Sequence, residues 1–341
     1  MTNHAGWRSD HPDMEFAQAS LQKRLESLLS ELASLKSRTT EEAVHDTRVQ
    51  SRRMRSALEA FEDLLPPRPY KAVYESVRRI TKTLGRPREQ GVSLALLREL
   101  TLGGDMAENL CREYLEERFA REMRKQGQRL EKGLKAIDGR SLRSQVEFLL
   151  AAMEPQELWE APRVRRRSAA RAASAQLALF PPHSQPAERG LRIVAQLAMP
   201  VLSFRAPQQF RRASDDRLHG LRIAAKKLRY GLEIFEPVLP KGFQPCIGQA
   251  KALQDAAGIY HDWCVLNEQL KEEIRRLNRR GTVHLAFQIG RLLAHASDIK
   301  KNLRKRILPE LTGLQAMLAP LLSVPSKTTP EPVQEPSAAQ G

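Results

Sequence analysis

Apolar residues recur every three or four positions along most of the chain, from Met14 to about Leu322. This spacing places them on one face of an α-helix, whereas the strict alternation that is typical of strands is rare. Glycine and proline interrupt the pattern between segments, as they do between helices. The pattern predicts an all-α protein.

One amphipathic pattern occurs twice, over residues 44–66 and again over residues 218–240. Equivalent residues lie 174 positions apart, as His45 and His219 do. The identical pairs are His45/His219, Arg48/Arg222, Arg55/Arg229, Leu58/Leu232, Glu59/Glu233, Phe61/Phe235, Glu62/Glu236, Leu65/Leu239 and Pro66/Pro240, and Arg52/Lys226 and Arg53/Lys227 are conservative pairs. This agreement predicts an internal duplication with two related helical halves.

Each copy has a basic face opposite an apolar face, because successive residues of a helix point about 100° apart. The basic faces consist of His45, Arg48, Arg52 and Arg55 in the first copy and His219, Arg222, Lys226 and Arg229 in the second. The apolar faces consist of Met54, Leu58 and Phe61, and of Leu228, Leu232 and Phe235. Like charges on one face repel one another. The same crowding in both copies therefore favours an anion-binding surface over a solvated one.

Local signals set the expected ends of these two helices. Thr39 stands three residues before a glutamate, which is the spacing of a capping box, and either Ser214 or Asp215 can cap the second helix. Prolines at 66–67 and at 237 predict where the helices stop.

The repeated stretches VHDTRVQSRRMRSALEAF and LHGLRIAAKKLRYGLEIF resemble the signature helices of the CHAD family, a histidine-bearing α-helical domain. LGRPREQGV (84–92) and LQDAAGIYHDWCVL (253–266) are similar to the helix-turn-helix segments that follow each signature helix in that family. The resemblance covers most of residues 12–322. It implies two helical bundles related by an approximate two-fold axis, with a basic groove or channel between them.

The resemblance also implies binding of inorganic polyphosphate, with ligand contacts assigned to the residues of the two basic faces. The neighbouring Arg53 and Lys227 complete the predicted site. Arginine can bind phosphate oxygens through its planar fork, lysine offers a compact charge, and histidine donates a single hydrogen bond. Association with polyphosphate granules follows from the resemblance alone.

A second basic stripe runs along the segment 105–137, beside an apolar stripe of Leu115, Phe119, Met123, Leu130, Leu134 and Ile137. Its members are spaced three or four residues apart and are Arg118, Arg121, Lys125, Arg129 and Lys132. The same segment contains glutamates that can balance these charges, namely Glu113, Glu116, Glu117, Glu122 and Glu131. The stripe therefore predicts either an additional anion-binding surface, formed by Arg118, Arg121, Lys125 and Arg129, or a solvated face.

The middle of the chain contains the run Arg163-Val164-Arg165-Arg166-Arg167, an alanine-rich stretch and several prolines. This composition predicts a basic crossover between two halves. Both ends are predicted to be disordered. The expected division is residues 1–12 (disordered), one domain over 13–322 (first half 13–155, crossover 156–190, second half 191–322), and 323–341 (disordered tail).

The chain has 56 Lys and Arg against 40 Asp and Glu, a net charge of +16. Such an excess favours a polyanionic partner, namely polyphosphate, nucleic acid or an anionic membrane surface. Aromatic residues make up 5%, few for the stacking platforms that bind single-stranded nucleic acid. Nucleic acid remains the alternative partner. Without a signal-like segment or a long apolar run, we expect a cytoplasmic protein with no membrane partner.

The sequence contains no phosphate-binding glycine loop and no HExxH or GxSxG motif. His261 and Asp262 do not predict a metal site, because neighbouring helical residues point about 100° apart. His45 and His219 could accept a phosphoryl group, but no carboxylate common to both copies orients their rings. We expect a non-catalytic protein without cofactor or metal, the alternative being a polyphosphate-processing or phosphohistidine enzyme. The cysteines, expected to be buried, reduced and inert, are Cys111, Cys246 and Cys264.

Overall fold

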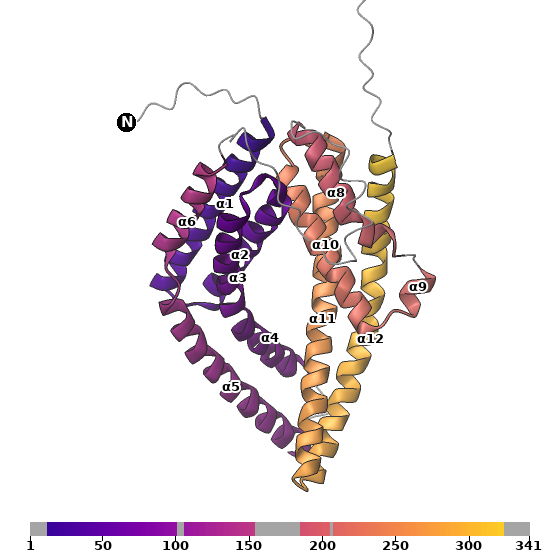
Figure 1. The fold of residues 1–341 in the computed structure, drawn as a ribbon. Coiled ribbons are helices and arrows are strands. Elements are labelled where there is room, and N and C mark those ends of the chain that lie inside the picture. The colour runs from indigo at the N-terminus through magenta and orange to yellow at the C-terminus, as the bar shows by residue number, and fades with distance from the viewer. Residues whose placement is uncertain (1–11, 101–105, 154–184, 205–206, 324–341) are drawn as a thin grey trace, which may run out of the picture.

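The structure is a computed structural model that describes residues 12–100, 106–153, 185–204 and 207–323. Every regular element within these ranges is helical, which confirms the all-α prediction (Figure 1). The predicted disordered ends, apart from Pro12 and Ser323, and the arginines at 163–167 lie outside the described residues. The same holds for the side chains of residues 86–90.

Four helices of the first part pack in a closed ring, in which α1 contacts α2, α2 contacts α3, α3 contacts α6, and α6 contacts α1. They are α1 (Pro12–Ser37), α2 (Glu41–Ala60), α3 (Pro67–Thr83) and α6 (Gly139–Ala151), with the 3₁₀ turn η1 (Glu62–Leu64) between α2 and α3.

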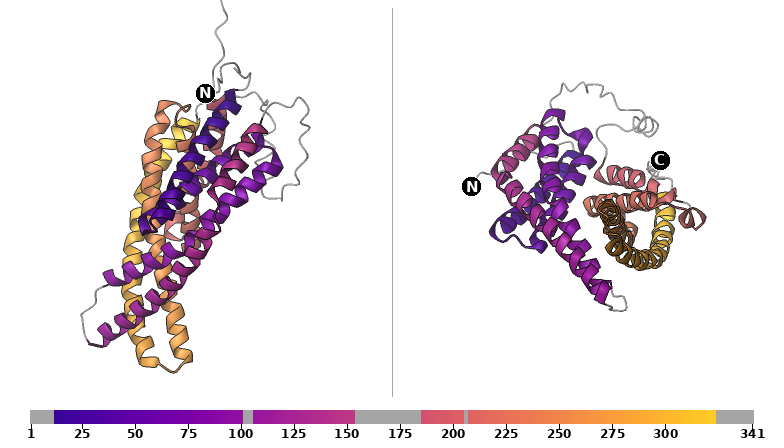
Figure 2. Two further views of the ribbon diagram at one scale, coloured as in Figure 1. Left: turned by 90° about the vertical axis from the view of Figure 1, so that its left-hand side faces the viewer. Right: turned by 90° about the horizontal axis from the view of Figure 1, so that it is seen from below.

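Four helices of the second part repeat this order of contacts, from α8 to α10, α11, α12 and back to α8. They are α8 (Pro186–Leu202), α10 (Asp215–Phe235), α11 (Gln244–Arg279) and α12 (Val283–Ser323), with the short α9 (Gln208–Arg211) and η2 (Lys241–Phe243) between them. Seen from below, the two sets of helices lie side by side (Figure 2). The shared order agrees with a duplication, which itself stays a prediction.

A two-helix arm, formed by α4 (Gly85–Glu99) and α5 (Met106–Lys135), extends from the first bundle to α11 and α12 (Figure 1). Its buried Leu97 and Leu115 belong to one apolar cluster with Trp263 of α11. Next to this cluster, Tyr114 donates a hydrogen bond to the buried carboxylate of Glu273. The arm therefore joins the two bundles at the end away from α1 and α8.

The main apolar core continues from one bundle into the other where α2 meets α10. Phe61 and Phe235 are completely buried there, and the ring of Phe16 stacks on that of Phe235 with centroids 5.7 Å apart. A Cβ atom on Gly190 would lie 3.0 Å from Phe235, so glycine allows α8 to approach this ring closely. The buried Arg189 donates hydrogen bonds to both Asp13 and Asp63. These contacts fix α8 against α1 and η1.

Both apolar faces predicted for the repeated helices are buried in this core, as expected. Ser214 caps α10 by accepting a hydrogen bond from the backbone N–H of Arg217, which settles the choice left open with Asp215. The prediction for the other helix was off by one residue. Thr40 caps α2, and the hydroxyl of Thr39 instead donates to the carbonyl of Leu35.

Of the two expected helix-turn-helix segments, one contains a helix boundary and the other does not. A boundary occurs at Leu84, between α3 and α4, whereas α11 continues through Gly258 without a turn. Helix-forming neighbours and packing along α12 keep this glycine helical. The second bundle also begins earlier than Leu191. Pro186 lies in the first turn of α8, where a missing backbone N–H costs nothing.

Candidate functional site

An open pocket of about 510 Å³ lies where α2, α10 and α11 meet. Cationic side chains from all three helices line it, and the lining residues are His45, Asp46, Arg48, Val49, Arg52, Arg53, Arg222, Lys226, Arg229, Tyr230, Lys251, Gln254, Asp255, Gly258, Ile259 and Asp262. The basic faces of α2 and α10 thus meet in one cavity. Seven of the ten predicted site residues line it. The lining does not include Arg55, His219 or Lys227.

Lys226 lies at the electrostatic centre of this pocket. Burial, together with the positive charges of Arg52, Arg222 and Arg48, lowers the pKa of its ammonium to about 7. Within the described part of the chain, no side chain or carbonyl pairs with Lys226 by a hydrogen bond or an ion pair. The charges of α2 and α10 are therefore close enough together to make a proton on this amine unfavourable.

Two other arginines of the pocket share one carboxylate. Arg53 of α2 donates to Glu233 of α10 at 3.2 Å, and Arg229 lies 3.3 Å from the same carboxylate. Arg229 is 9% exposed and lies over the ring of Tyr230. Glu233 therefore links the two helices and offsets part of the positive charge at this end of the pocket.

Arg55, the counterpart of Arg229, has local partners outside the pocket. Its guanidinium donates to the hydroxyl of Tyr74 at 3.0 Å and lies 3.6 Å from Glu59. Its charge nevertheless contributes to the lowered pKa of Lys226, and its ligand-contacting role stays a prediction. Lys227 is exposed beside the pocket.

His219 contacts His261 of α11, with 3.2 Å between their Nδ1 atoms and ring centroids 4.3 Å apart. Burial and the charges of Arg222 and Lys226 lower the pKa of His219. Burial and the charge of Arg222 lower the pKa of His261 to about 4. Both imidazoles are consequently neutral at pH 7, with one ring positioned to donate an N–H hydrogen bond to the other.

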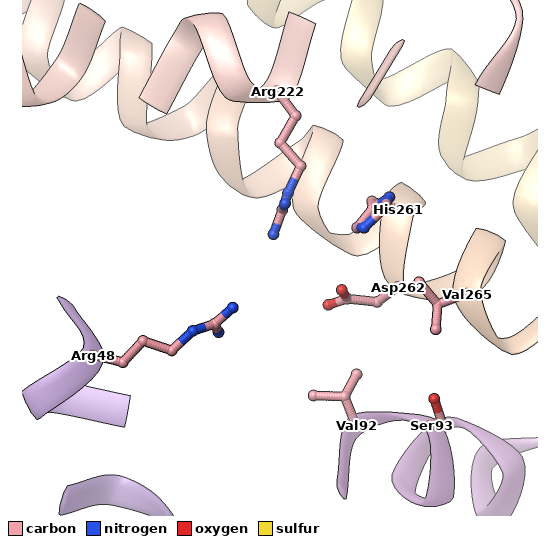
Figure 3. A pocket seen from close by; sticks show the side chains of 7 residues that line it. All are labelled: Arg48, Val92, Ser93, Arg222, His261, Asp262 and Val265. Atoms are coloured by element: carbon pink, nitrogen blue, oxygen red, sulfur yellow. The ribbon is translucent and has the colours of Figure 1, made fainter. Parts of the chain in front are cut away.

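A smaller cavity of about 50 Å³ adjoins the arm (Figure 3). Arg48 and Arg222 line it as well as the main pocket, and their guanidinium groups extend into the same space from α2 and α10. Val92 and Ser93 of α4 form the opposite wall, and Asp262 projects from α11 (Figure 3). The arm thus closes one side of the space between the two arginines.

Helix α11 contributes pocket residues that the sequence pattern does not predict. One face of α11 lines the pocket. Its residues follow the helical pattern i, i+3, i+4, i+7 and i+11, and they are Lys251, Gln254, Asp255, Gly258 and Asp262. That spacing was visible in the sequence, but nothing in it indicated that this face meets the repeated helices. The contact between His261 and His219 has no signal in the sequence.

The four additional cations predicted on α5 do not line this pocket. Arg118 lies 3.7 Å from Glu273 and Arg121 lies 3.3 Å from Glu117. Lys125 and Arg129 are exposed. Two of the four cations are therefore ion-paired and two are solvated, and an additional anion-binding role for this stripe stays a prediction.

The described residues include no group of three or more His, Cys, Asp or Glu side chains arranged to hold a metal ion. In the same part of the chain, no helix has the length and apolar character needed to cross a membrane.

Cys111 and Cys246 are buried and Cys264 is half-buried, all with free thiols. Burial raises the pKa of Cys111 and of Cys264 to about 11, which disfavours the reactive thiolate.

Comparison with known proteins identifies the family. The sequence model of the CHAD domain matches residues 19–271, which include α2, α10 and most of α11. The chain belongs to the CHAD domain family. No curated protein sequence matches the chain.

Solved structures share this CHAD fold. The crystal structure of the CHAD domain from the plant Ricinus communis has a TM-score of 0.58 and 22% identity, covering 93% of this chain and 97% of that one. PptA from Streptomyces chartreusis has a TM-score of 0.58 and 14% identity, covering 90% and 99%. At these identities the likeness shows the fold alone.

Proposed function

We propose that this CHAD protein binds inorganic polyphosphate in the pocket between α2, α10 and α11. The observation that carries the proposal is the gathering of Arg48, Arg52 and Arg222 around Lys226 in a cavity open to solvent. A phosphate chain entering there would offset the repulsion among these charges. Arginine forks would bind its oxygens, and Lys226 would regain its proton.

A linear polyanion suits the distribution of charge better than a single phosphate. Cations enter the pocket from three helices, and Arg48 and Arg222 continue the basic lining into the smaller cavity beside α4. Several phosphates could be engaged at once, each releasing counterions. We therefore expect affinity to rise with chain length and to fall with salt.

Nucleic acid is the alternative polyanion. Among the described lining residues, Tyr230 is the sole Phe, Tyr or Trp, and it is buried beneath Arg229. A base would find only the imidazole of His45 on which to stack, with no exposed Phe, Tyr or Trp ring. This feature favours a ligand that consists of phosphate alone.

The proposal assigns binding without catalysis. Hydrolysis requires a positioned base and water, and phosphoryl transfer requires an oriented nucleophile with a clamp on the departing charge. His219 contacts another histidine rather than a carboxylate, which supports a hydrogen-bonding role. A gel of polyphosphate length after hours with protein and magnesium, together with a test for acid-labile phosphate on the protein, checks this point. Shortened chains or phosphohistidine at His45 or His219 would favour the enzyme.

The decisive experiment is a calorimetric titration with long polyphosphate, orthophosphate, duplex DNA and duplex RNA, at matched charge concentration and two salt concentrations. We expect long polyphosphate to bind most tightly. The variant Arg48→Ala/Arg222→Ala should lose this binding, whereas Arg121→Ala on α5 is the matched control. Equal affinity for orthophosphate and long chains, or tighter binding of duplex, would contradict the proposal. Recruitment to polyphosphate granules, followed with a fluorescent fusion, should disappear in the same double variant.

A further inference from the structure

Lys226 differs from Lys300 and Lys36, two paired lysines, in having cations for neighbours. Lys300 donates to Asp215 at 2.8 Å, and Lys36 donates to the carbonyl of Ile137 at 2.7 Å. Among the described residues, nothing accepts a hydrogen bond from Lys226. The carboxylate of Glu233, about two turns further along α10, is paired with Arg53 and Arg229.

The charged groups around Lys226 come from every helix that lines the pocket. Arg48 and Arg52 approach from α2, and Arg222 lies one turn earlier on α10. From α11 come one cation, Lys251, and two carboxylates, Asp255 and Asp262. Burial of the amine and, after it, the charges of the arginines lower the pKa of Lys226 to about 7. A large share of these amines is therefore uncharged at neutral pH.

We propose that Lys226 is a nucleophilic amine that takes an acyl group from acyl phosphates bound by the arginines of its pocket. An acyl phosphate combines an anionic phosphate, which Arg48 and Arg222 can bind through their forks, with an electrophilic carbonyl carbon. The cavity of about 510 Å³ is large enough for such a small molecule beside the lysine.

The reaction is a simple acyl transfer. The Nζ lone pair of Lys226 attacks the carbonyl carbon, a C–N bond forms, and the C–O bond to phosphate breaks. Inorganic phosphate leaves, and the proton lost from nitrogen passes to it or to water. The product is a neutral amide, so the modification removes a potential positive charge from the pocket permanently.

Selectivity follows from the difference between Lys226 and its neighbour Lys227. Lys227 is exposed on the same helix and does not line the pocket. An ordinary lysine, with a pKa of about 10.4, has about one amine in a thousand uncharged at pH 7.5. A lower pKa reduces the intrinsic nucleophilicity of an amine. The accompanying increase in the fraction of uncharged amine is larger than this loss. We expect Lys226 to react at least about tenfold faster than Lys227.

The test uses the wild-type protein, so it does not depend on the folding of a variant. Acetyl phosphate at pH 7.5 is the probe, and mass spectrometry of peptides follows acetylation at each lysine with time. The N-hydroxysuccinimide ester of acetic acid, which lacks a phosphate, is the matched reagent. Faster labelling of Lys226 than of Lys227 by both reagents, with the larger preference for acetyl phosphate, is the expected result.

Other outcomes overturn the proposal. If Lys226 reacts no faster than Lys227 with either reagent, it is not a nucleophilic amine. If only the ester labels Lys226 faster than Lys227, the arginines do not direct an acyl phosphate to Lys226. Arg52→Gln should slow acetylation of Lys226 severalfold by removing one neighbouring charge, whereas Arg121→Gln on α5 should not.

Adding polyphosphate provides a separate test. Its presence should slow acetylation of Lys226 and leave the exposed Lys82 of α3 unchanged, because the chain would cover the pocket and restore the proton on the amine. Protection depends on the proposed function, whereas selective acetylation does not. Fast labelling without protection would therefore contradict polyphosphate binding alone, and protection of Lys226 without faster labelling than Lys227 would contradict the nucleophilic amine alone.

Discussion

Phe61 and Phe235, equivalent residues of the two repeated helix patterns, contact each other edge to face with ring centroids 5.6 Å apart. Both are completely buried where α2 meets α10. This contact fixes the apolar faces of the two helices against a common core. Their basic faces can consequently share one pocket, so the packing of two phenylalanines sets the spacing of charges that lie about two to four turns away.

We expect Phe235→Ala to destabilise the fold by about 3–5 kcal/mol, because it removes a buried ring that Phe16, Phe61 and Gly190 contact. Urea unfolding followed by circular dichroism measures the change. Phe148→Ala, at a ring that is 65% exposed, is the control and should change the free energy of unfolding little. Similar losses in both variants would mean that the α2–α10 contact does not carry this part of the stability.

Arg48 and Arg222 should contribute more to polyphosphate affinity than the histidines three residues before them. Alanine at either arginine removes a charged fork, costing about 1.5–3 kcal/mol or about 10- to 150-fold in Kd. His219→Ala should cost less at pH 8, because burial and the neighbouring cations lower its pKa and keep the ring neutral. Calorimetry at pH 8 compares the variants. A larger loss for His219→Ala than for Arg222→Ala would reverse this ranking.

The features that sequence predicted best are those set within one helix. Met54, Leu58 and Phe61 lie at helical spacing, and all are buried. The hydroxyl of Ser214 also caps its helix as expected. Apolar periodicity and capping depend on neighbours within a few residues, which a single sequence contains in full.

The features that sequence could not predict depend on contacts between distant segments. Arg55 and Arg229 are equivalent on the helical wheel, yet Tyr74 of α3 helps to hold Arg55 outside the pocket. His261 lies 42 residues from His219 and meets it through the packing of α10 on α11. No helical periodicity contains such information, because it arises from the tertiary arrangement.

Glu233→Gln should strengthen polyphosphate binding. The carboxylate of Glu233 pairs with both Arg53 and Arg229, so its removal leaves two pocket arginines available to the ligand. We expect about 3- to 10-fold tighter binding at low salt, with a smaller gain at high salt. Calorimetric titrations at two salt concentrations measure it. Glu59→Gln, at the equivalent position beside Arg55, is the control and should have a smaller effect. Unchanged or weaker binding by Glu233→Gln would show that these arginines do not contact the ligand.

Lys226 should make polyphosphate binding depend on pH. Its pKa of about 7 in the free protein means that the pocket gains a positive charge as pH falls from 8 to 6. Bound phosphate would raise this pKa, so binding takes up protons and tightens toward low pH. Titrations in two buffers of different ionisation enthalpy at pH 7.5 measure the uptake. Lys226→Met should abolish most of it, whereas Lys227→Met, at the exposed neighbour, should retain it.

Lys226→Met should also stabilise the free protein while it weakens binding. Because the pKa of Lys226 falls from 10.5 to about 7 on folding, the unfolded chain binds more protons than the folded one between these values. The cost of keeping this charge among arginines is therefore fully present below pH 7 and fades as pH rises toward 10. Methionine has no such cost and fills a similar volume. Thermal unfolding at pH 6 and pH 9 should show a larger gain in Tm for the variant at pH 6. An equal gain at both pH values would mean that methionine stabilises by packing and that the crowded charge on Lys226 does not oppose folding.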